Sequence, residues 1–462
     1  MLFHTFEFFV FLLLFVAGTA LLRGQPRVWF YVGMSYVFYA AAYPPHLLLL
    51  IGSTAVDYAV GARLARAETT AARRLWLTAS LAFNLGLLGV FKYSGFLVQG
   101  FNALGLPLSL PDPELRLPIG ISFYTFHSLS YTIDLYRRAI PPARSLAEYA
   151  CFVALFPHLV AGPILRAGDL LPQIATHRPF EREATVRGME LCLVGFFKKA
   201  VIADHLARFV DPVFAAPAEH GGAMIWIAAL LFTAQIYCDF SGYTDIARGL
   251  ARILGFRFPQ NFRWPYFSES IQDFWRRWHM SLSFWIRDYL YVSLGGSRGS
   301  LGRTLLNLLV TWLLVGLWHG AAVTFVLWGL YNGLLLALGR LLAPGRFLPR
   351  WLCIGATLAL VVFGWTVFRA QATADIAVLW GRMLAPWSAG FLDVPATYLG
   401  LLGGLALLYV LHGLTWRRGY DPERGGILPR LPFAWRAAAV TLGAYAIVLL
   451  AGDTQSFIYF AF

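Results

Sequence analysis

The fold class is decided by one long apolar run near the middle of the chain. Residues 304–338 read TLLNLLVTWLLVGLWHGAAVTFVLWGLYNGLLLAL and contain no Asp, Glu, Lys or Arg. A straight helix of this length would measure about 50 Å, whereas the hydrocarbon core of a bilayer is about 30 Å thick. We therefore expect the run to cross the membrane with a break or a steep tilt. Gly316, His319 and Gly320 mark the expected break.

The composition of the whole chain is that of a polytopic helical membrane protein. Of its 462 residues, 58% are hydrophobic and only 13% are charged, about half of the charged fraction of a soluble domain. Apolar stretches of about 20 residues, the length of a transmembrane helix, recur along the sequence. We predict an all-α fold with about 11–13 membrane segments, some of them re-entrant or interfacial. The predicted segments are residues 4–22, 28–43, 46–62, 75–92, 119–136, 149–165, 187–205, 223–240, 304–318, 321–339, 351–368, 394–414 and 434–451.

One predicted segment, residues 149–165, contains Pro157 and Pro163 and has basic residues on both sides. A re-entrant hairpin and a full crossing therefore both fit this segment. Elsewhere the sequence shows no internal repeat and no Pro/Gly/Ser-rich linker that would separate a second domain. We expect one integral membrane domain over residues 1–462.

The basic residues indicate how the chain lies in the membrane. The formal net charge is +13, but the Arg residues fall in short loops between apolar runs. This is the positive-inside pattern, which implies membrane lipids and no nucleic acid as partners. The arginines between residues 63 and 74 predict a cytoplasmic loop and the acidic segment 97–118 an outer one, so that both termini are expected outside the cytoplasm. The four scattered cysteines predict neither a metal site nor a disulfide framework.

A polar segment interrupts the apolar pattern between residues 239 and 303. Within it, residues 271–290 read IQDFWRRWHMSLSFWIRDYL, and a step of about 100° per residue divides them into two faces. The pattern predicts one interfacial helix with His279 at the border between the faces. A simple membrane anchor is the alternative to a ligand site here, and Asp239 and Asp245 also suit helix caps or partners for arginines. One face is apolar and aromatic (Ile271, Phe274, Trp275, Trp278, Leu282, Trp285, Tyr289), and the other is mainly polar (Asp273, Arg276, Arg277, Met280, Phe284, Arg287, Asp288).

His319 is the strongest single pointer to function. An ionisable ring at hydrocarbon depth is costly, and such residues are commonly functional. Irregular polar backbone at this depth is tolerated only where it lines a buried cavity, which the residues around 239–303 suggest. A structural core histidine is the alternative, and the residues alone leave both open.

Several motifs of the polar segment belong together. They are Asp239-Phe240-Ser241-Gly242-Tyr243-Thr244-Asp245, Gln260-Asn261-Phe262, Phe274-Trp275-Arg276-Arg277-Trp278-His279, Arg287-Asp288-Tyr289-Leu290-Tyr291 and Gly316-Leu317-Trp318-His319-Gly320. Together they resemble the membrane-bound O-acyltransferase (MBOAT) family, in particular its bacterial branch of alginate O-acetylation and teichoic-acid D-alanyl transfer. The resemblance touches most of the chain and is most specific over residues 239–333.

This resemblance implies transfer of an acyl group to a hydroxyl within a central tunnel, where donor and acceptor meet from opposite sides of the membrane. His319 matches the principal catalytic histidine of the family, and His279 matches its second conserved site. As a hypothesis, neutral His319 takes the hydroxyl proton, while His279 and Asn261 position the thioester or stabilise the oxyanion. Further candidates for the tunnel or for substrate positioning are Asp239, Asp245, Trp278 and Trp318. Candidates for the phosphates of the donor, because guanidinium groups suit phosphate oxygens, are Arg276, Arg277, Arg287 and Arg298.

The resemblance also suggests the substrates and the location. Acetyl-CoA is the expected co-substrate, with no tightly bound cofactor and no metal, in the bacterial cytoplasmic (inner) membrane. The acceptor is expected to be an extracytoplasmic polysaccharide (alginate-like, cellulose or peptidoglycan) or a partner that acetylates it, namely a periplasmic or membrane-anchored SGNH-type acetyltransferase. Two alternatives stay open: D-alanyl-type transfer from a carrier protein, and a polysaccharide or lipid transporter without chemistry.

Overall fold

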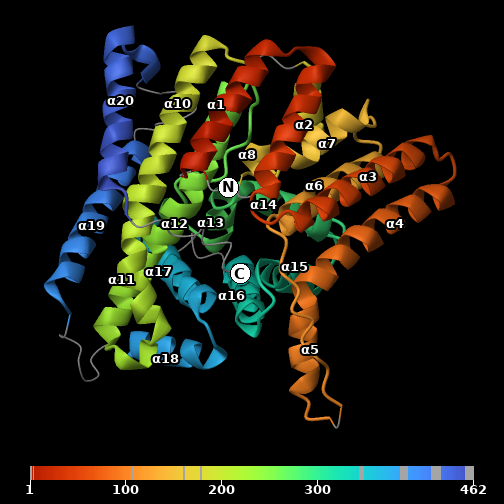
Figure 1. Cartoon of the computed structure of the whole chain (residues 1–462). Coiled ribbons are helices and arrows are strands. Elements are labelled where there is room, and N and C mark those ends of the chain that lie inside the picture. Colours follow the sequence, from red (N-terminus) through yellow and green to blue (C-terminus); the bar gives the residue numbers. More distant parts are fainter. Residues whose placement is uncertain are drawn as a thin grey trace. The chain divides into compact units, whose positions relative to one another are not determined.

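The computed structural model of the chain describes residues 3, 5–106, 108–159, 162–176, 179–342, 348–385, 394–417 and 428–452. In this part of the chain the secondary structure is helical, without strands (Figure 1). Within these described ranges, eight helices are long and apolar enough to cross a membrane, which confirms the all-α, polytopic class. They are α3 (Pro45–Arg66), the continuous helix of α4 (Thr70–Leu88), η1 (Gly89–Tyr93) and α5 (Ser94–Asn102), α12 (Gly222–Ile253), α15 (Leu301–His319), α16 (Val323–Leu342), α17 (Arg350–Arg369), α19 (Ala396–Arg417) and α20 (Phe433–Leu450).

The other predicted segments form shorter or interrupted helices. The segment at 149–165 is broken at Leu155, so that it is not one straight helix, and residues 160–161 within it lie outside the described part. The side of the membrane on which each terminus lies stays a prediction, and residues 453–462 are likewise outside the description. The remaining elements are α1 (Phe6–Leu21), α2 (Gly24–Ala40), α6 (Ile121–Tyr136), α7 (Leu146–Ala154), α8 (Phe156–Leu159), α9 (Ala167–Ala175), α10 (Arg182–Phe196), η2 (Phe197–Ala203), α11 (Asp204–Ala215), η3 (Pro217–Glu219), η4 (Pro265–Phe267), α18 (Thr373–Leu384) and η7 (Leu428–Arg430).

By its internal contacts the chain divides into two compact units. The first comprises Met1–Cys192 and Thr244–Pro259, and the second comprises Leu193–Tyr243 and Gln260–Phe462. The single membrane domain over residues 1–462 stays a prediction.

In the first unit, α3, α4 and α6 pack against one another, and a buried arginine joins their ends. Arg73 of α4 is 8% exposed, and its guanidinium donates to the backbone oxygens of Leu64 (3.1 Å), Leu135 (2.8 Å) and Tyr136 (2.9 Å). These oxygens belong to the last turns of α3 and α6, where helix carbonyls lack intrahelical partners. The side chain of Arg73 therefore caps two helices. From the sequence, Arg73 was expected only to be one of the basic residues of a cytoplasmic loop.

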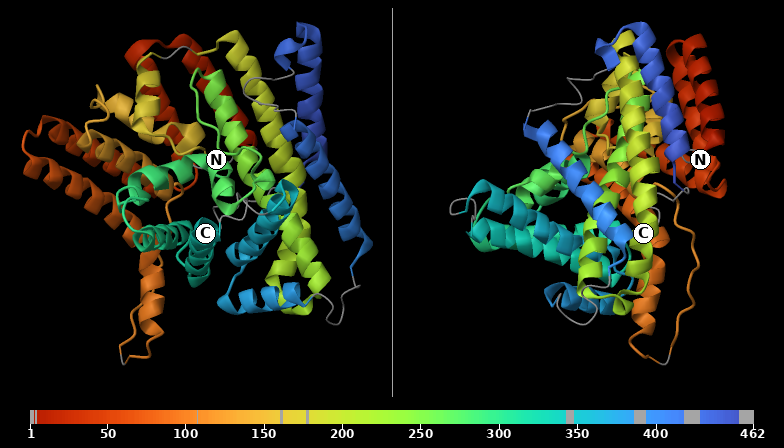
Figure 2. Two further views of the ribbon diagram at one scale, coloured as in Figure 1. Left: turned by 180° about the vertical axis from the view of Figure 1, so that it is seen from behind. Right: turned by 90° about the vertical axis from the view of Figure 1, so that its left-hand side faces the viewer.

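In the second unit, α15 and α16 form a tight hairpin (Figure 2). Ser300 caps α15 by accepting from the backbone N–H of Arg303 at 3.3 Å. The two backbones touch, because a Cβ atom added at Gly316 would overlap the carbonyl oxygen of Phe325 and one at Gly329 would overlap that of Trp312. The helix ends at His319, which confirms the predicted break in the run 304–338.

The prediction of one interfacial helix over residues 271–290 is wrong. The segment consists of α13 (Ile271–Arg277), α14 (Met280–Trp285) and the π-helical turn η5 (Ile286–Tyr291), with the break at Trp278 and His279. His279 adopts the left-handed region (φ 42°, ψ 53°) and is 1% exposed, so it does not lie at the border between two faces. The apolar side chains are nevertheless all buried; they are Ile271, Phe274, Trp275, Trp278, Leu282, Trp285 and Tyr289.

Candidate active site

His319 is the last residue of α15 and is 5% exposed. Its ring centroid lies 4.9 Å from that of Trp318, 4.9 Å from that of Trp328 on α16 and 5.5 Å from that of Phe368 on α17. All three contacts are edge-on, with interplanar angles of 77–83°. Aromatic side chains from three helices thus hold the imidazole in a water-poor environment.

Position 320, directly after His319, has no room for a side chain. A Cβ atom at Gly320 would overlap the ring of Phe325, and Phe325 in turn packs edge-on against Phe368 at 5.2 Å. A larger residue at position 320 would therefore displace the aromatic wall that holds His319. The Trp-His-Gly motif is explained by packing as much as by chemistry.

His279 lies in the break between α13 and α14, outside the membrane-spanning helices. Its ring packs edge-on against Phe240 of α12 at 4.6 Å. Burial lowers the pKa of His279 to about 3, so that the imidazole is neutral at cellular pH. A left-handed conformation at a residue with a Cβ atom is strained, and such residues cluster at functional sites.

Asn261 explains why the helix breaks at His279. Its backbone oxygen accepts from the N–H of Met280 at 2.9 Å, and its Oδ1 accepts from the N–H of Ser281 at 3.0 Å. Both N–H groups belong to the first turn of α14, where helix donors lack intrahelical partners. The Nδ2 group of Asn261 is buried and makes no hydrogen bond within the described residues. The structure thus places Asn261 beside His279, with one free donor.

The two histidines are linked by a continuous series of aromatic contacts in the second unit. Between successive rings from His319 to His279, the centroid distances are 4.9, 6.3, 4.9, 4.9, 5.1 and 4.6 Å. Trp278 is part of this series, and its role in lining a tunnel stays a prediction, whereas the other members were not singled out from the sequence. The intervening residues are, in order, Trp328, Trp365, Trp278, Phe262 and Phe240.

A buried amide on α16 supports this aromatic series. Asn332 accepts from the indole N–H of Trp275 at 3.1 Å and donates to the backbone oxygen of Trp328 at 2.9 Å. Its location inside an apolar helix is the one sequence signal that could have identified it, because buried amides are hydrogen-bonded.

Asp239 forms a buried ion triad. Its Oδ1 lies 2.8 Å from Nζ of Lys199, which also lies 2.8 Å from Oδ1 of Asp204, and the three residues are 1–3% exposed. The cation is a lysine rather than one of the arginines considered from the sequence. Asp245 belongs to the first unit, where it pairs with Arg248 at 3.5 Å. A substrate-positioning role for either carboxylate stays a prediction.

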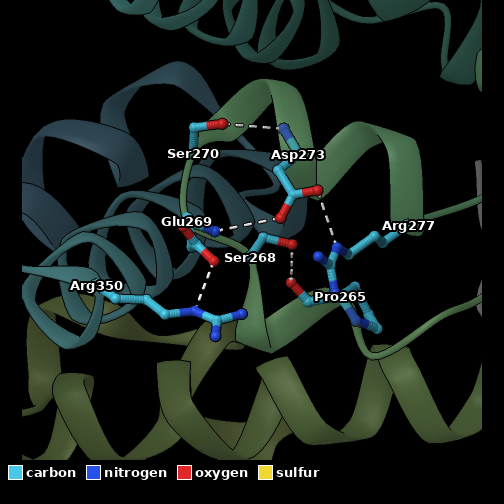
Figure 3. A network of polar contacts seen from close by, with 7 residues as sticks. All are labelled: Pro265, Ser268, Glu269, Ser270, Asp273, Arg277 and Arg350. Atoms are coloured by element: carbon cyan, nitrogen blue, oxygen red, sulfur yellow. Dashed lines mark hydrogen bonds and ion pairs between the residues drawn. The ribbon is translucent and has the colours of Figure 1, made fainter. Parts of the chain in front are cut away.

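The four arginines proposed for phosphate binding differ in their surroundings. Arg277 pairs with Asp273 at 2.9 Å, next to the Ser270 cap of α13 and the Glu269–Arg350 pair at 2.7 Å (Figure 3). Arg287 is bound by the neighbouring carboxylate of Asp288 at 2.6 Å, and this hydrogen bond raises the pKa of Arg287. Arg276 and Arg298 are exposed. Two of the four guanidinium groups are thus already engaged by carboxylates.

Comparison with known proteins gives a consistent result. Residues 122–365 match the MBOAT family, described as the membrane-bound O-acyltransferase family. The chain is similar to the probable alginate O-acetylase AlgI of Pseudomonas aeruginosa, with 45% identity over 392 residues, 82% of this chain and 74% of that protein. It is also similar to the peptidoglycan O-acetyltransferase of Helicobacter pylori (34% identity, 75% of this chain and 71% of that protein) and to the teichoic acid D-alanyltransferase of Bacillus subtilis (26% identity, 64% and 82%). The resemblance inferred from the motifs is confirmed: the chain belongs to the membrane-bound O-acyltransferase family.

Proposed function

We propose that this O-acyltransferase moves an acetyl group from cytoplasmic acetyl-CoA across the membrane to a hydroxyl of an extracytoplasmic polysaccharide, or to a partner protein that acetylates it. The observation that carries the proposal is the aromatic enclosure of His319 at the break between α15 and α16. The names of the relatives support the acetyl group and a polysaccharide acceptor, since two of them are named for the O-acetylation of alginate and of peptidoglycan.

The chemistry needs one base and one group of hydrogen-bond donors. His319 takes the proton of the acceptor hydroxyl, whose oxygen attacks the thioester carbonyl and forms a C–O bond. The C–S bond then breaks, and the proton passes from His319 to the departing thiolate. Between these steps the negative charge on the carbonyl oxygen needs fixed donors nearby.

His279 and Asn261 suit the role of these donors. A neutral imidazole carries one N–H, and the low pKa of His279, which results from burial, keeps the ring neutral while it donates. The buried Nδ2 of Asn261 supplies a second donor beside it. Asn261 is held by the backbone N–H of Ser281 and the ring of His279 is packed against Phe240, so little reorganisation is required during the reaction.

The phosphates of the donor are assigned to the exposed arginines rather than to the paired ones. Arg276 and Arg298 are exposed, whereas Arg277 and Arg287 would have to leave Asp273 and Asp288 first. The proposed partner is an SGNH-type acetyltransferase on the outer side of the membrane.

The test uses the purified full-length protein in lipid nanodiscs with radiolabelled acetyl-CoA and an oligosaccharide acceptor. Acetyl transfer by the wild type with loss in His319→Ala is the expected result. Transfer of D-alanine from a charged carrier protein, with no use of acetyl-CoA, would replace the proposed donor. Passage of the oligosaccharide through the membrane with no consumption of either donor would favour a transporter.

A further inference from the structure

We propose that Asp57 in the first unit is a proton-binding site at bilayer depth, in which the bound proton completes a chain of hydrogen bonds across α3, α4 and α6. This site is separate from the acyl-transfer chemistry proposed above and does not depend on it. The ligand is a proton, and the groups around it are a carboxyl group, two hydroxyls and an amide.

Asp57 lies far from either end of a membrane-spanning helix. It is 0% exposed on α3, which runs from Pro45 to Arg66. At 1.5 Å per residue, Asp57 is about 18 Å from the first residue of this helix and about 14 Å from the last. Acidic residues at this depth are rare and commonly mark proton or ion sites.

The partners of Asp57 are neutral. Ser80 Oγ lies 2.7 Å from Asp57 Oδ1, and Asn84 Nδ2 lies 2.9 Å from each carboxyl oxygen. The titratable groups that face Asp57 from α6 and α7 are the phenols of Tyr131 and Tyr149. Ser80, Asn84 and Tyr149 are themselves fully buried.

No cation compensates a charge on Asp57 in the part of the chain that the structure describes. Arg73 on α4 is buried, but its guanidinium is bound to the carbonyl groups at the ends of α3 and α6. The buried carboxylates of the second unit, Asp204 and Asp239, differ in that they share Lys199. An ionised Asp57 would therefore be an unpaired charge in an apolar environment, whereas a protonated one is not.

The hydrogen bonds of the neighbouring hydroxyls require an additional hydrogen. Ser80 Oγ is 2.7 Å from Asp57 and 3.2 Å from Thr132 Oγ1, although a serine hydroxyl has a single hydrogen. Thr132 cannot supply another, because its Oγ1 donates to the backbone oxygen of Ser128 at 3.1 Å. A proton on Asp57 resolves this: Asp57 donates to Ser80, Ser80 to Thr132 and Thr132 to the carbonyl of Ser128.

The amide of Asn84 argues for a proton rather than a metal cation. Its Nδ2 covers both carboxyl oxygens at 2.9 Å, and an N–H group repels a metal ion. Hard metal cations need several oxygen ligands around an open carboxylate. In this arrangement the hydroxyls of Ser80 and Ser128 are the neighbours that can accept a hydrogen from the carboxyl group.

Infrared difference spectroscopy of the purified full-length protein during a pH titration tests the proposal. The wild type is expected to show, at neutral pH, a protonated-carboxyl C=O band that shifts in heavy water. Asp57→Asn should lose this band. Asp239→Asn is the matched control, because Asp239 is equally buried but paired with Lys199, and it should retain the band. Ser80→Ala should shift the band, because it removes the acceptor of the proton.

Absence of the band in the wild type, or its persistence in Asp57→Asn, would overturn the proposal. If Asp57→Asn fails to fold, the wild-type titration and the Ser80→Ala shift decide alone, and an unshifted band counts against Asp57. A melting temperature that rises with sodium chloride but not with choline chloride, and only when Asp57 is present, would assign the site to a metal cation instead.

Discussion

Lys199 Nζ lies 2.8 Å from Asp239 Oδ1, and this ion pair, extended to Asp204, is buried almost completely. The residue after Asp239 is Phe240, whose ring packs against that of His279 at 4.6 Å. A Cβ atom at Gly242, one turn further, would lie 2.8 Å from the carbonyl oxygen of Gly195. The part of α12 that supports His279 is therefore held in two ways. The ion triad links it to Lys199 of η2, and the missing side chain of Gly242 lets its backbone approach that of α10 closely.

Replacing the lysine should destabilise the protein strongly. Lys199→Met removes the cation that the two buried carboxylates share, and breaking a buried pair in this way costs about 3–5 kcal/mol. Glu183→Gln, which removes the exposed partner of Arg187 on α10, should cost less than about 1 kcal/mol. Thermal unfolding followed by tryptophan fluorescence in detergent measures both. Equal melting temperatures for the two variants would show that the triad contributes little.

Removal of the proposed base should slow acyl transfer strongly without preventing insertion. We expect His319→Ala to lower the transfer rate by about 10²–10⁴-fold, the usual contribution of general base catalysis. His412→Ala is the matched control, because His412 on α19 is also packed against aromatic rings, those of Tyr237 and Phe267. Rates are compared at equal amounts of folded protein after size-exclusion chromatography. A normal rate in His319→Ala would remove this residue from the mechanism.

The left-handed backbone of His279 predicts that glycine at this position is more stable than alanine, the reverse of the order within a helix. Because φ is 42°, glycine at this position relieves strain that alanine retains, and His279→Gly should be more stable than His279→Ala by about 1 kcal/mol. At Met280, the first residue of α14, the order should reverse, with alanine more stable than glycine. Chemical unfolding of the four variants gives both differences. The same order at both positions would contradict the strained conformation.

The low pKa of His279 also predicts how stability depends on pH. The folded pKa of about 3 lies below the ordinary value of 6.5, so between these values the unfolded chain binds more protons than the folded one. The stabilisation is complete above pH 6.5 and is lost as the pH falls toward 3, by up to about 1.4 kcal/mol per pH unit. Melting temperatures from pH 7 to pH 4 should fall more steeply for the wild type than for His279→Gln. Parallel curves would indicate a solvated ring.

The glycine after His319 should resist even the smallest substitution. In Gly320→Ala the added Cβ atom displaces Phe325, which packs on Phe368 beside His319, so both transfer rate and stability should decrease. The double variant Gly320→Ala/Phe325→Leu should recover part of the stability. Gly339→Ala on α16, where nothing lies within 4 Å of the new atom, should be neutral or slightly stabilising.

Local patterns in the sequence predicted the features that depend on local length and hydropathy. The long helices and the break at His319 follow from the length of apolar runs against the thickness of a bilayer, and the MBOAT motifs identified the family. The break at His279 could not be predicted in this way. It depends on hydrogen bonds from Asn261, which precedes α14 by a loop and a separate helix, and such contacts override an otherwise regular helical period.

The buried charge pairs likewise could not be predicted from the sequence pattern. Lys199 and Asp204 lie within or beside a predicted apolar segment, and only the packing of η2 against α12 brings Asp239 to them. Asp57 was not singled out, because a lone carboxyl group in an apolar run says nothing of the hydroxyls that neighbouring helices supply. Pairings between distant helices are set by tertiary packing.

The contact between Gly316 and Gly329 limits how substrates can reach His319. Because the backbones of α15 and α16 are in contact here, neither an acyl group nor a sugar can pass between the two helices along this stretch. The imidazole of His319 is therefore not reached through the contact between α15 and α16.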